Sequence, residues 1–139
     1  MTDYPRSHWV EPSYPITGPA PRQRTTVAVC HWSGGGSVPA DKPRWLRDMQ
    51  RSWVNGRGYS LGYWALVCQN GDSYQIRGDD FNAAANPGDK VTGNANDWTA
   101  PILFDVVPNE WASIQAIETA KRLWRGWGVT GRPVPHSAL

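Results

Sequence analysis

Histidine is the residue type in this chain whose number and placement first suggest chemistry. The chain has three of them, His8, His31 and His136. His31 stands at the exit of the run TTVAVC, just before a glycine-rich stretch, and His136 lies near the last residue, in PVPHSAL. Imidazole is a common zinc ligand, and an open catalytic zinc site takes three protein ligands and a water molecule. His31 and His136 could share one ion only if the fold brings them together, and a lone histidine is more often an ordinary hydrogen-bonded group.

The patterns next to His31 predict the elements that position it. Residues 25–30 predict a short strand that is apolar on both faces, as in strands covered by helices on both sides. A helix is expected from about Asp41, its candidate N-cap, to the stop signal Asn55-Gly56, with Pro43 in its first turn. Its apolar stripe consists of Trp45, Leu46, Met49 and Trp53.

The second half of the chain repeats this alternation of strands and a helix. Residues 63–68 and 72–77 predict two strands joined by an Asn70-Gly71 turn, and residues 102–107 predict another buried strand. Asn109 is the expected cap of a second helix, whose predicted buried stripe is Ile114, Ile117, Leu123 and Trp124. The fold class is therefore α/β, a single domain with a mixed central β-sheet and helices packed on it.

The two ends of this pattern define the domain organisation. Residues 1–24 are rich in proline and lack an apolar period, which predicts an extended arm over the domain surface. Residues 25–139 form the domain itself. Its segment 78–99 has no periodicity, and a loop of this length is usually functional or mobile. We expect it to line or overhang a groove, with Asn96 and Trp98 facing the ligand, although Trp98 could instead fill the core.

Composition excludes several classes of protein. The chain of 139 residues has a net charge of +2 without a basic arm or stripe, which gives no support for nucleic-acid binding. No apolar run approaches the roughly 20 residues of a membrane span, and the N-terminus lacks the apolar region of an ordinary signal peptide. Cys30 and Cys68 are expected to be reduced core residues rather than a disulfide. Most of the nine tryptophans should fill the core, but a groove that stacks on sugars is the functional alternative, with Trp32 as a candidate.

Four segments, in order, resemble the zinc-dependent N-acetylmuramoyl-L-alanine amidases of the peptidoglycan-recognition-protein and phage-lysozyme type. They are VAVCHWSGG, GRGYSLGYWALV, NGDSYQIRG and PHSAL. The resemblance implies that His31 and His136 are zinc ligands and that Tyr63 lies over the metal and assists the reaction. It also implies the substrate, peptidoglycan, and the bond, the amide between N-acetylmuramic acid and L-alanine of the stem peptide. Without the resemblance, Tyr63 would be interpreted as a packed aromatic residue.

The chain departs from that family at several ligand and helper positions. The third ligand of the family, a cysteine or aspartate, follows the second histidine by several residues, whereas the sequence stops at Leu139. A catalytic lysine of the same tail is absent, and a middle histidine is replaced within FNAAAN. The missing ligand could come from further sequence or from a partner chain. Less expected sources are His8 and the acidic residues Asp79 and Asp80.

Three functions of different classes remain open at this stage. The first is a phage-type peptidoglycan hydrolase, either held in the host cytoplasm until release through a holin-type membrane hole or carried on a virion. The second is an amidase-like module that binds cell wall without cutting it. The third is a structural part of a virion that reuses the fold. Stoichiometric zinc would favour the first.

Overall fold

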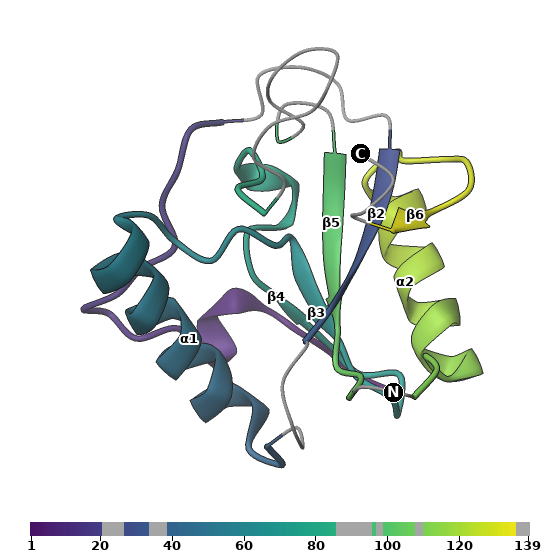
Figure 1. Cartoon of the computed structure of the whole chain (residues 1–139), viewed down its shortest axis with the longest axis horizontal. Coiled ribbons are helices and arrows are strands. Elements are labelled where there is room, and N and C mark those ends of the chain that lie inside the picture. The colour runs from purple at the N-terminus through teal and green to yellow at the C-terminus, as the bar shows by residue number, and fades with distance from the viewer. Residues whose placement is uncertain (21–26, 34–38, 86–95, 97–98, 108–109, 136–139) are drawn as a thin grey trace.

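The computed structural model of the chain describes residues 1–20, 27–33, 39–85, 96, 99–107 and 110–135. These residues form a six-stranded sheet and two α-helices, α1 (Lys42–Arg57) and α2 (Ile114–Gly126). The strands are β1 (Asp3–Tyr4), β2 (Val27–Trp32), β3 (Ala65–Val67), β4 (Ser73–Gln75), β5 (Thr99–Phe104) and β6 (Val134–Pro135). The chain is thus a single α/β domain with a mixed sheet, as the sequence predicts (Figure 1).

The sheet has the strand order β1-β4-β3-β5-β2-β6. The β3–β4 hairpin is antiparallel and every other pair is parallel. The longest pairing joins β2 to β5, from Val27 opposite Thr99 to Trp32 opposite Phe104. All six residues of β5 are buried, as expected for a strand with helices on both faces.

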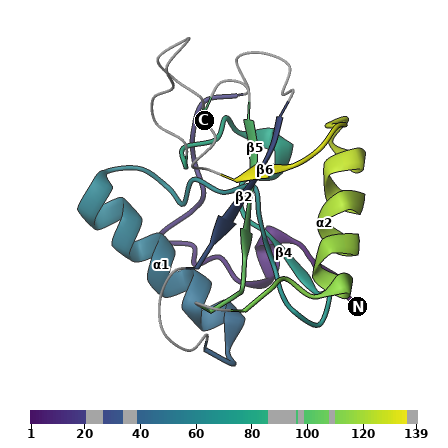
Figure 2. The same cartoon turned by 45° about the vertical axis from the view of Figure 1, so that its right-hand side comes forward.

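The two helices lie on opposite sides of the sheet, as two views of the chain show (Figure 1, Figure 2). Each helix closes its own apolar cluster. Leu46 of α1 packs in one cluster with Leu66 and Leu103, and Trp124 of α2 packs in the other with Ile102 and Phe104. Neighbouring side chains of a strand point to opposite faces, so the central strands β3 and β5 contribute to both clusters.

The start of α1 confirms the sequence prediction, but its end does not. Asp41 is the N-cap, and its side chain accepts a hydrogen bond from the Arg44 backbone N–H at 3.1 Å. The helix runs through Asn55-Gly56 and ends at Gly58, whose φ of 80° lies in the left-handed region. This conformation ends the helix, and glycine adopts it without a steric penalty, so Gly58 rather than Gly56 is the stop signal.

The second helix begins later than predicted. Its N-cap is Ser113, not Asn109, because the Ser113 hydroxyl accepts a hydrogen bond from the Ala116 backbone N–H at 3.0 Å. The buried face also differs from the predicted stripe. It consists of Ala116, Thr119, Ala120 and Trp124. Small side chains let the helix approach the sheet closely, and this orientation leaves Ile114 and Ile117 exposed and Leu123 only partly buried.

The N-terminal residues are more than an arm over the surface. β1 pairs in parallel with β4, which extends the sheet at one edge. The Trp9 side chain is buried in the α1-side cluster and its indole N–H donates to the Gln75 carbonyl at 2.7 Å. The predicted boundary after residue 24 falls among residues 21–26, outside the described part of the chain.

The two cysteines are free thiols, in agreement with the prediction. Cys30 packs against the α2-side cluster and Cys68 lies in the α1-side cluster. Among the described residues, none of the helices is long and apolar enough to cross a membrane.

Candidate functional site

His31 and Tyr63, two of the residues singled out in the sequence, lie in contact on the α1 side of the sheet. Their ring centroids are 5.1 Å apart and the rings meet edge to face at 71°. His31 is the fifth residue of β2 and is 8% exposed, whereas Tyr63 lies two residues before β3. The β-branched run therefore holds an imidazole at a fixed place on the sheet, and the following strand brings a phenol to it.

Further aromatic rings continue from Tyr63 along the end of α1. Trp53 meets Tyr63 at 5.6 Å between centroids, and Tyr59 meets Trp53 at 5.9 Å. The guanidinium of Arg57 lies 3.9 Å from the centroid of the Trp53 ring, in a cation–π contact. We refer to His31, Tyr63, Trp53 and Tyr59 as the aromatic row. The apolar stripe predicted for α1 places Trp53 in the core, and no sequence pattern singles out Arg57 or Tyr59. The density of aromatic residues near the helix end is the signal that could have found them.

The environment of Tyr63 keeps its hydroxyl protonated. Burial raises the pKa of the Tyr63 phenol, and the positive charge of Arg57 opposes this only in part. A phenol with a raised pKa remains a hydrogen-bond donor at neutral and mildly alkaline pH. Tyr63 can therefore donate to an oxygen atom that gains negative charge beside His31.

A buried arginine holds the segment that leads to Tyr63. Arg77 is 2% exposed and donates to the carbonyl oxygens of Leu61 at 2.7 Å, Ser60 at 2.9 Å and Asn82 at 2.5 Å. Its burial lowers the pKa of the guanidinium to about 10. The rigid fork of an arginine can bridge three carbonyl groups that belong to two separate loops. Arg77 thus fixes the backbone just before Tyr63 to the segment after residue 80.

Two further contacts complete this anchor. The Gln50 side chain, buried on α1, accepts from the Leu61 N–H at 2.8 Å and donates to the Pro15 carbonyl at 3.0 Å. Gly62 lies against the backbone of Ala84, and a Cβ at Gly62 would stand 2.6 Å from the Ala84 carbonyl oxygen. The Ala84 N–H also donates to the Gly62 carbonyl at 3.0 Å. Residue 62 must therefore be glycine for the two loops to meet.

The structure separates Trp32 from this cluster. Trp32 follows His31 directly, so its side chain points to the α2 side, where its ring lies 5.7 Å from that of Phe104. Asn96 is half-buried, and the residues on both sides of it lie outside the described part. Trp98 and His136 also lie outside the described residues. The substrate-binding roles of Asn96 and Trp98 stay predictions.

Zinc requires more donors than the described residues gather around His31. Among these residues no group of three histidine, cysteine, aspartate or glutamate side chains could hold a metal ion. The Cys30 thiol packs on the other face of the sheet. His8 stacks on Tyr4 of β1, and β1 lies four strand positions from β2, about 19 Å at the usual strand spacing. Neither residue is a partner for His31 in this fold.

The acidic residues considered as a third zinc ligand do not lie at His31, whereas the last strand, β6, ends next to β2, which carries His31. Asp80 forms an ion pair with Arg6 at 3.0 Å, and Asp79 lies exposed beside it. β6 pairs with β2 in parallel, with Pro135 opposite Cys30. Pro135 is the last residue of β6 and directly precedes His136, and its partner Cys30 directly precedes His31. This register is the structural observation that bears on the predicted second ligand.

Comparison with known proteins shows the fold. No family model matches the chain, and no curated protein matches it. Among solved structures, human PGRP-IβC in complex with glycosamyl muramyl pentapeptide is 20% identical, with a TM-score of 0.77, and the match covers 98% of this chain and 84% of that one. Bumblebee PGRP-SA is 15% identical, with a TM-score of 0.78 and coverage of 99% and 84%.

Peptidoglycan recognition protein-LE in complex with tracheal cytotoxin, a monomeric diaminopimelic acid-type peptidoglycan, gives a similar match. It is 25% identical, with a TM-score of 0.74, and the match covers 96% of this chain and 81% of that one. The chain thus has the fold of the peptidoglycan recognition proteins.

Proposed function

We propose that this domain binds muramyl peptides of bacterial peptidoglycan along the aromatic row and is an N-acetylmuramoyl-L-alanine amidase. The observation that carries the proposal is the contact of His31 with Tyr63 on a fold shared with peptidoglycan recognition proteins. The solved structures of similar fold include complexes with a muramyl pentapeptide and with a monomeric peptidoglycan. Their ligands are the substrate class expected here.

The aromatic row suits such a ligand in two respects. The rings of Trp53 and Tyr59 offer apolar faces of the kind on which sugar rings stack, and Tyr59 is among the exposed aromatic residues. Arg57 supplies a cation next to them that can meet a carboxylate of the stem peptide. The ligand would thus lie along the C-terminal half of α1, with its scissile amide at His31 and Tyr63.

The proposed chemistry assigns separate tasks to the chain's own residues. His31 and His136 are the two imidazoles that would hold zinc (Zn2+), the latter because β6 ends one residue before it, opposite the residue before His31. Zinc, when bound, would supply a water molecule of lowered pKa and polarise the scissile carbonyl. Tyr63 would donate a hydrogen bond to the oxyanion that develops on that carbonyl. The third ligand would come from further sequence or a partner chain.

A second candidate function is binding without hydrolysis. It is favoured by the metal donors, because the described residues contain no group of three histidine, cysteine, aspartate or glutamate side chains that could hold a metal ion. A module of this kind would still recognise muramyl peptides through the aromatic row. The proposed setting of the amidase is a phage lysin, released from the host cytoplasm or carried on a virion, that acts at the cell wall. The proposed setting of the binding module is a larger virion assembly.

Zinc binding measured by equilibrium dialysis, together with release of stem peptide from purified cell wall, tests the amidase. We expect the 139-residue chain to hold zinc loosely, with little release, because two imidazoles leave the ion short of a ligand. His31→Ala should abolish zinc binding, whereas His8→Ala, its matched control at the far sheet edge, should leave it unchanged. Unchanged zinc binding in His31→Ala would refute the assigned ligand, and robust cleavage by the chain alone would show that the third ligand lies within it.

A further inference from the structure

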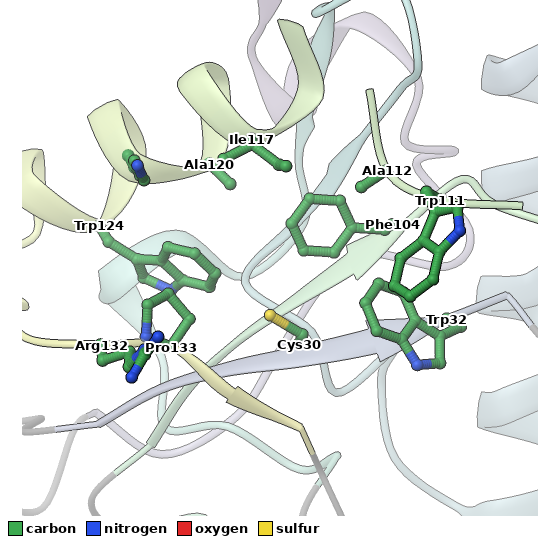
Figure 3. A pocket seen from close by; sticks show the side chains of 11 residues that line it. Cys30, Trp32, Phe104, Trp111, Ala112, Ile117, Ala120, Trp124, Arg132 and Pro133 are labelled. Atoms are coloured by element: carbon green, nitrogen blue, oxygen red, sulfur yellow. The ribbon is translucent and has the colours of Figure 1, made fainter. Parts of the chain in front are cut away.

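A concave site lies on the opposite side of the sheet from the aromatic row. It is a trough of about 510 Å³ between α2, the end of β2 and the segment before β6. Cys30 and Phe104 form its floor, and Ile117, Ala120 and Trp124 of α2 form one wall (Figure 3). The proposed amidase uses none of these residues.

One end of the trough carries two tryptophans that are poorly covered by the rest of the chain. Trp32 is 54% exposed and Trp111 is 91% exposed, and their side chains lie together at this end (Figure 3). Ile114, 77% exposed, lies one helical turn before Ile117 on α2. Contiguous apolar surface of this kind marks binding sites in soluble proteins, because its exposure to water is unfavourable.

The other end is positively charged. Arg132 lies there, beside Pro133 and Trp124 (Figure 3). Lys121 also lines the cavity. A shallower hollow of about 350 Å³ continues from this end, and it shares Lys121 with the trough and adds Arg125. None of the ion pairs formed among the described residues includes Lys121, Arg125 or Arg132. The trough therefore leads from an aromatic mouth to a cluster of cations that form no ion pair with the described part of the chain.

The floor offers almost nothing to a polar ligand. The indole N–H of Trp124 is already used, since it donates to the Ala100 carbonyl at 2.9 Å. The Cys30 thiol is a weak hydrogen-bond donor, and burial raises its pKa to about 11, so it stays uncharged. A peptide backbone laid along this floor would leave its amide groups without partners, which is costly in an apolar site. An aliphatic chain has no such groups.

We propose that the trough binds a monomeric anionic amphiphile, a single long alkyl chain whose carboxylate lies between Lys121 and Arg132. The chain would run over Cys30 and Phe104 toward Trp32 and Trp111, and would cover the exposed indoles. The charge of the basic end selects the sign of the headgroup, and the volume of about 510 Å³ limits the size of the alkyl chain. This site does not depend on the proposed amidase function.

Isothermal titration of the whole chain with dodecanoate, below its micelle concentration, tests this site. We expect saturable binding at one molecule per chain, with weaker binding of octanoate and of dodecyltrimethylammonium, which has the same chain and the opposite charge. Lys121→Glu should weaken dodecanoate binding by about tenfold or more, because it removes a charged hydrogen-bond donor and adds a repulsive charge. Arg44→Glu, an equal change of charge at an exposed position of α1, should leave it unchanged.

Three results would overturn the proposal. They are the absence of saturable dodecanoate binding, equal binding of the two amphiphiles of opposite charge, and equal effects of Lys121→Glu and Arg44→Glu. Ile117→Glu gives a second check, because this partly exposed residue lines the wall and can be replaced without disturbing the core. Wild-type affinity in that variant would also contradict the site. Binding to anionic phospholipid vesicles without binding of monomeric dodecanoate would show a membrane surface contact instead.

Discussion

Tyr63 is the residue on which the proposed chemistry can be tested most selectively. We expect Tyr63→Phe to retain the fold, zinc and muramyl-peptide binding, because the ring contacts with His31 and Trp53 survive. Stem-peptide release by a zinc-loaded form with a complete ligand set should fall by about 10²- to 10³-fold, the usual effect of losing one oxyanion donor. Single-turnover release measures this change. An unchanged rate would mean that the phenol only packs against His31.

Cys68 makes the stability of the domain sensitive to alkaline pH. Burial, with the nearby Asp105 carboxylate, raises the pKa of this thiol from 9.0 to about 12. Above pH 9 the unfolded chain therefore loses a proton that the folded chain keeps, so the free energy of unfolding falls as pH rises toward 12. The Cys68 contribution should be on the order of 1 kcal/mol between about pH 7 and about pH 9.5.

Urea unfolding at these two pH values measures the effect, and Cys68→Ala should show a shallower decrease than the wild type. Cys30 contributes in the same direction, because burial raises its pKa to about 11. Burial lowers the pKa of Arg77 to about 10, so Arg77 raises the free energy of unfolding with increasing pH, but only above about pH 10. An identical decrease in wild type and Cys68→Ala would show that the thiol titrates alike in both states.

At the scale of elements, the loop between α1 and β3 is held by backbone proximity at Gly62. Gly62→Ala should lower the free energy of unfolding by about 1–3 kcal/mol, because the added Cβ would collide with the backbone of Ala84 and Ala85. The matched control is Gly56→Ala, within α1, where a Cβ meets nothing within 4 Å. That change should raise stability by about 0.5–1 kcal/mol. Denaturant unfolding compares the two, and a neutral Gly62→Ala would contradict the close approach.

Arg77 anchors the same loop through its side chain. Arg77→Lys keeps the charge, but an ammonium group cannot reproduce the fork that bridges Ser60, Leu61 and Asn82. We expect a loss of about 2–4 kcal/mol in unfolding free energy, because buried carbonyl groups lose their donors. Arg44→Lys, at an exposed position, should change stability by less than about 0.5 kcal/mol. Thermal and denaturant unfolding distinguish the outcomes, and equal effects would contradict the anchoring role.

The elements also show where sequence patterns suffice and where they do not. Local signals identify α1 and its Asp41 cap, because a cap depends on neighbouring residues. The buried face of α2 could not be read from apolar residues alone, since small residues such as Ala116 and Ala120 face the sheet and Ile114 faces solvent. Which face of α2 is buried depends on how closely the helix can approach β5. A local pattern does not contain this information.

At the scale of the whole molecule, topology creates the candidate site. His31 was identified by its residue type, and Tyr63 by the resemblance of the sequence to zinc-dependent amidases. Their contact, however, requires β2 and β3 to lie on either side of β5 in one sheet. The alternation along β2 then sends Trp32 to the other face, against the sequence expectation that it serves the same groove. The support from Arg77 and Gln50 was also not foreseen, because their partners are backbone groups distant in sequence.

The fold thus offers two separate candidate binding faces, the aromatic row beside α1 and the trough beside α2. A titration of the isotopically labelled chain with a muramyl pentapeptide, followed by NMR chemical shifts, tests directly whether the aromatic row binds muramyl peptides. We predict that the signals of His31, Tyr63 and Trp53 change together and saturate, while those of Trp32 and Trp111 stay in place. Changes confined to Trp32 and Trp111, or no changes at all, would contradict muramyl-peptide recognition by the aromatic row.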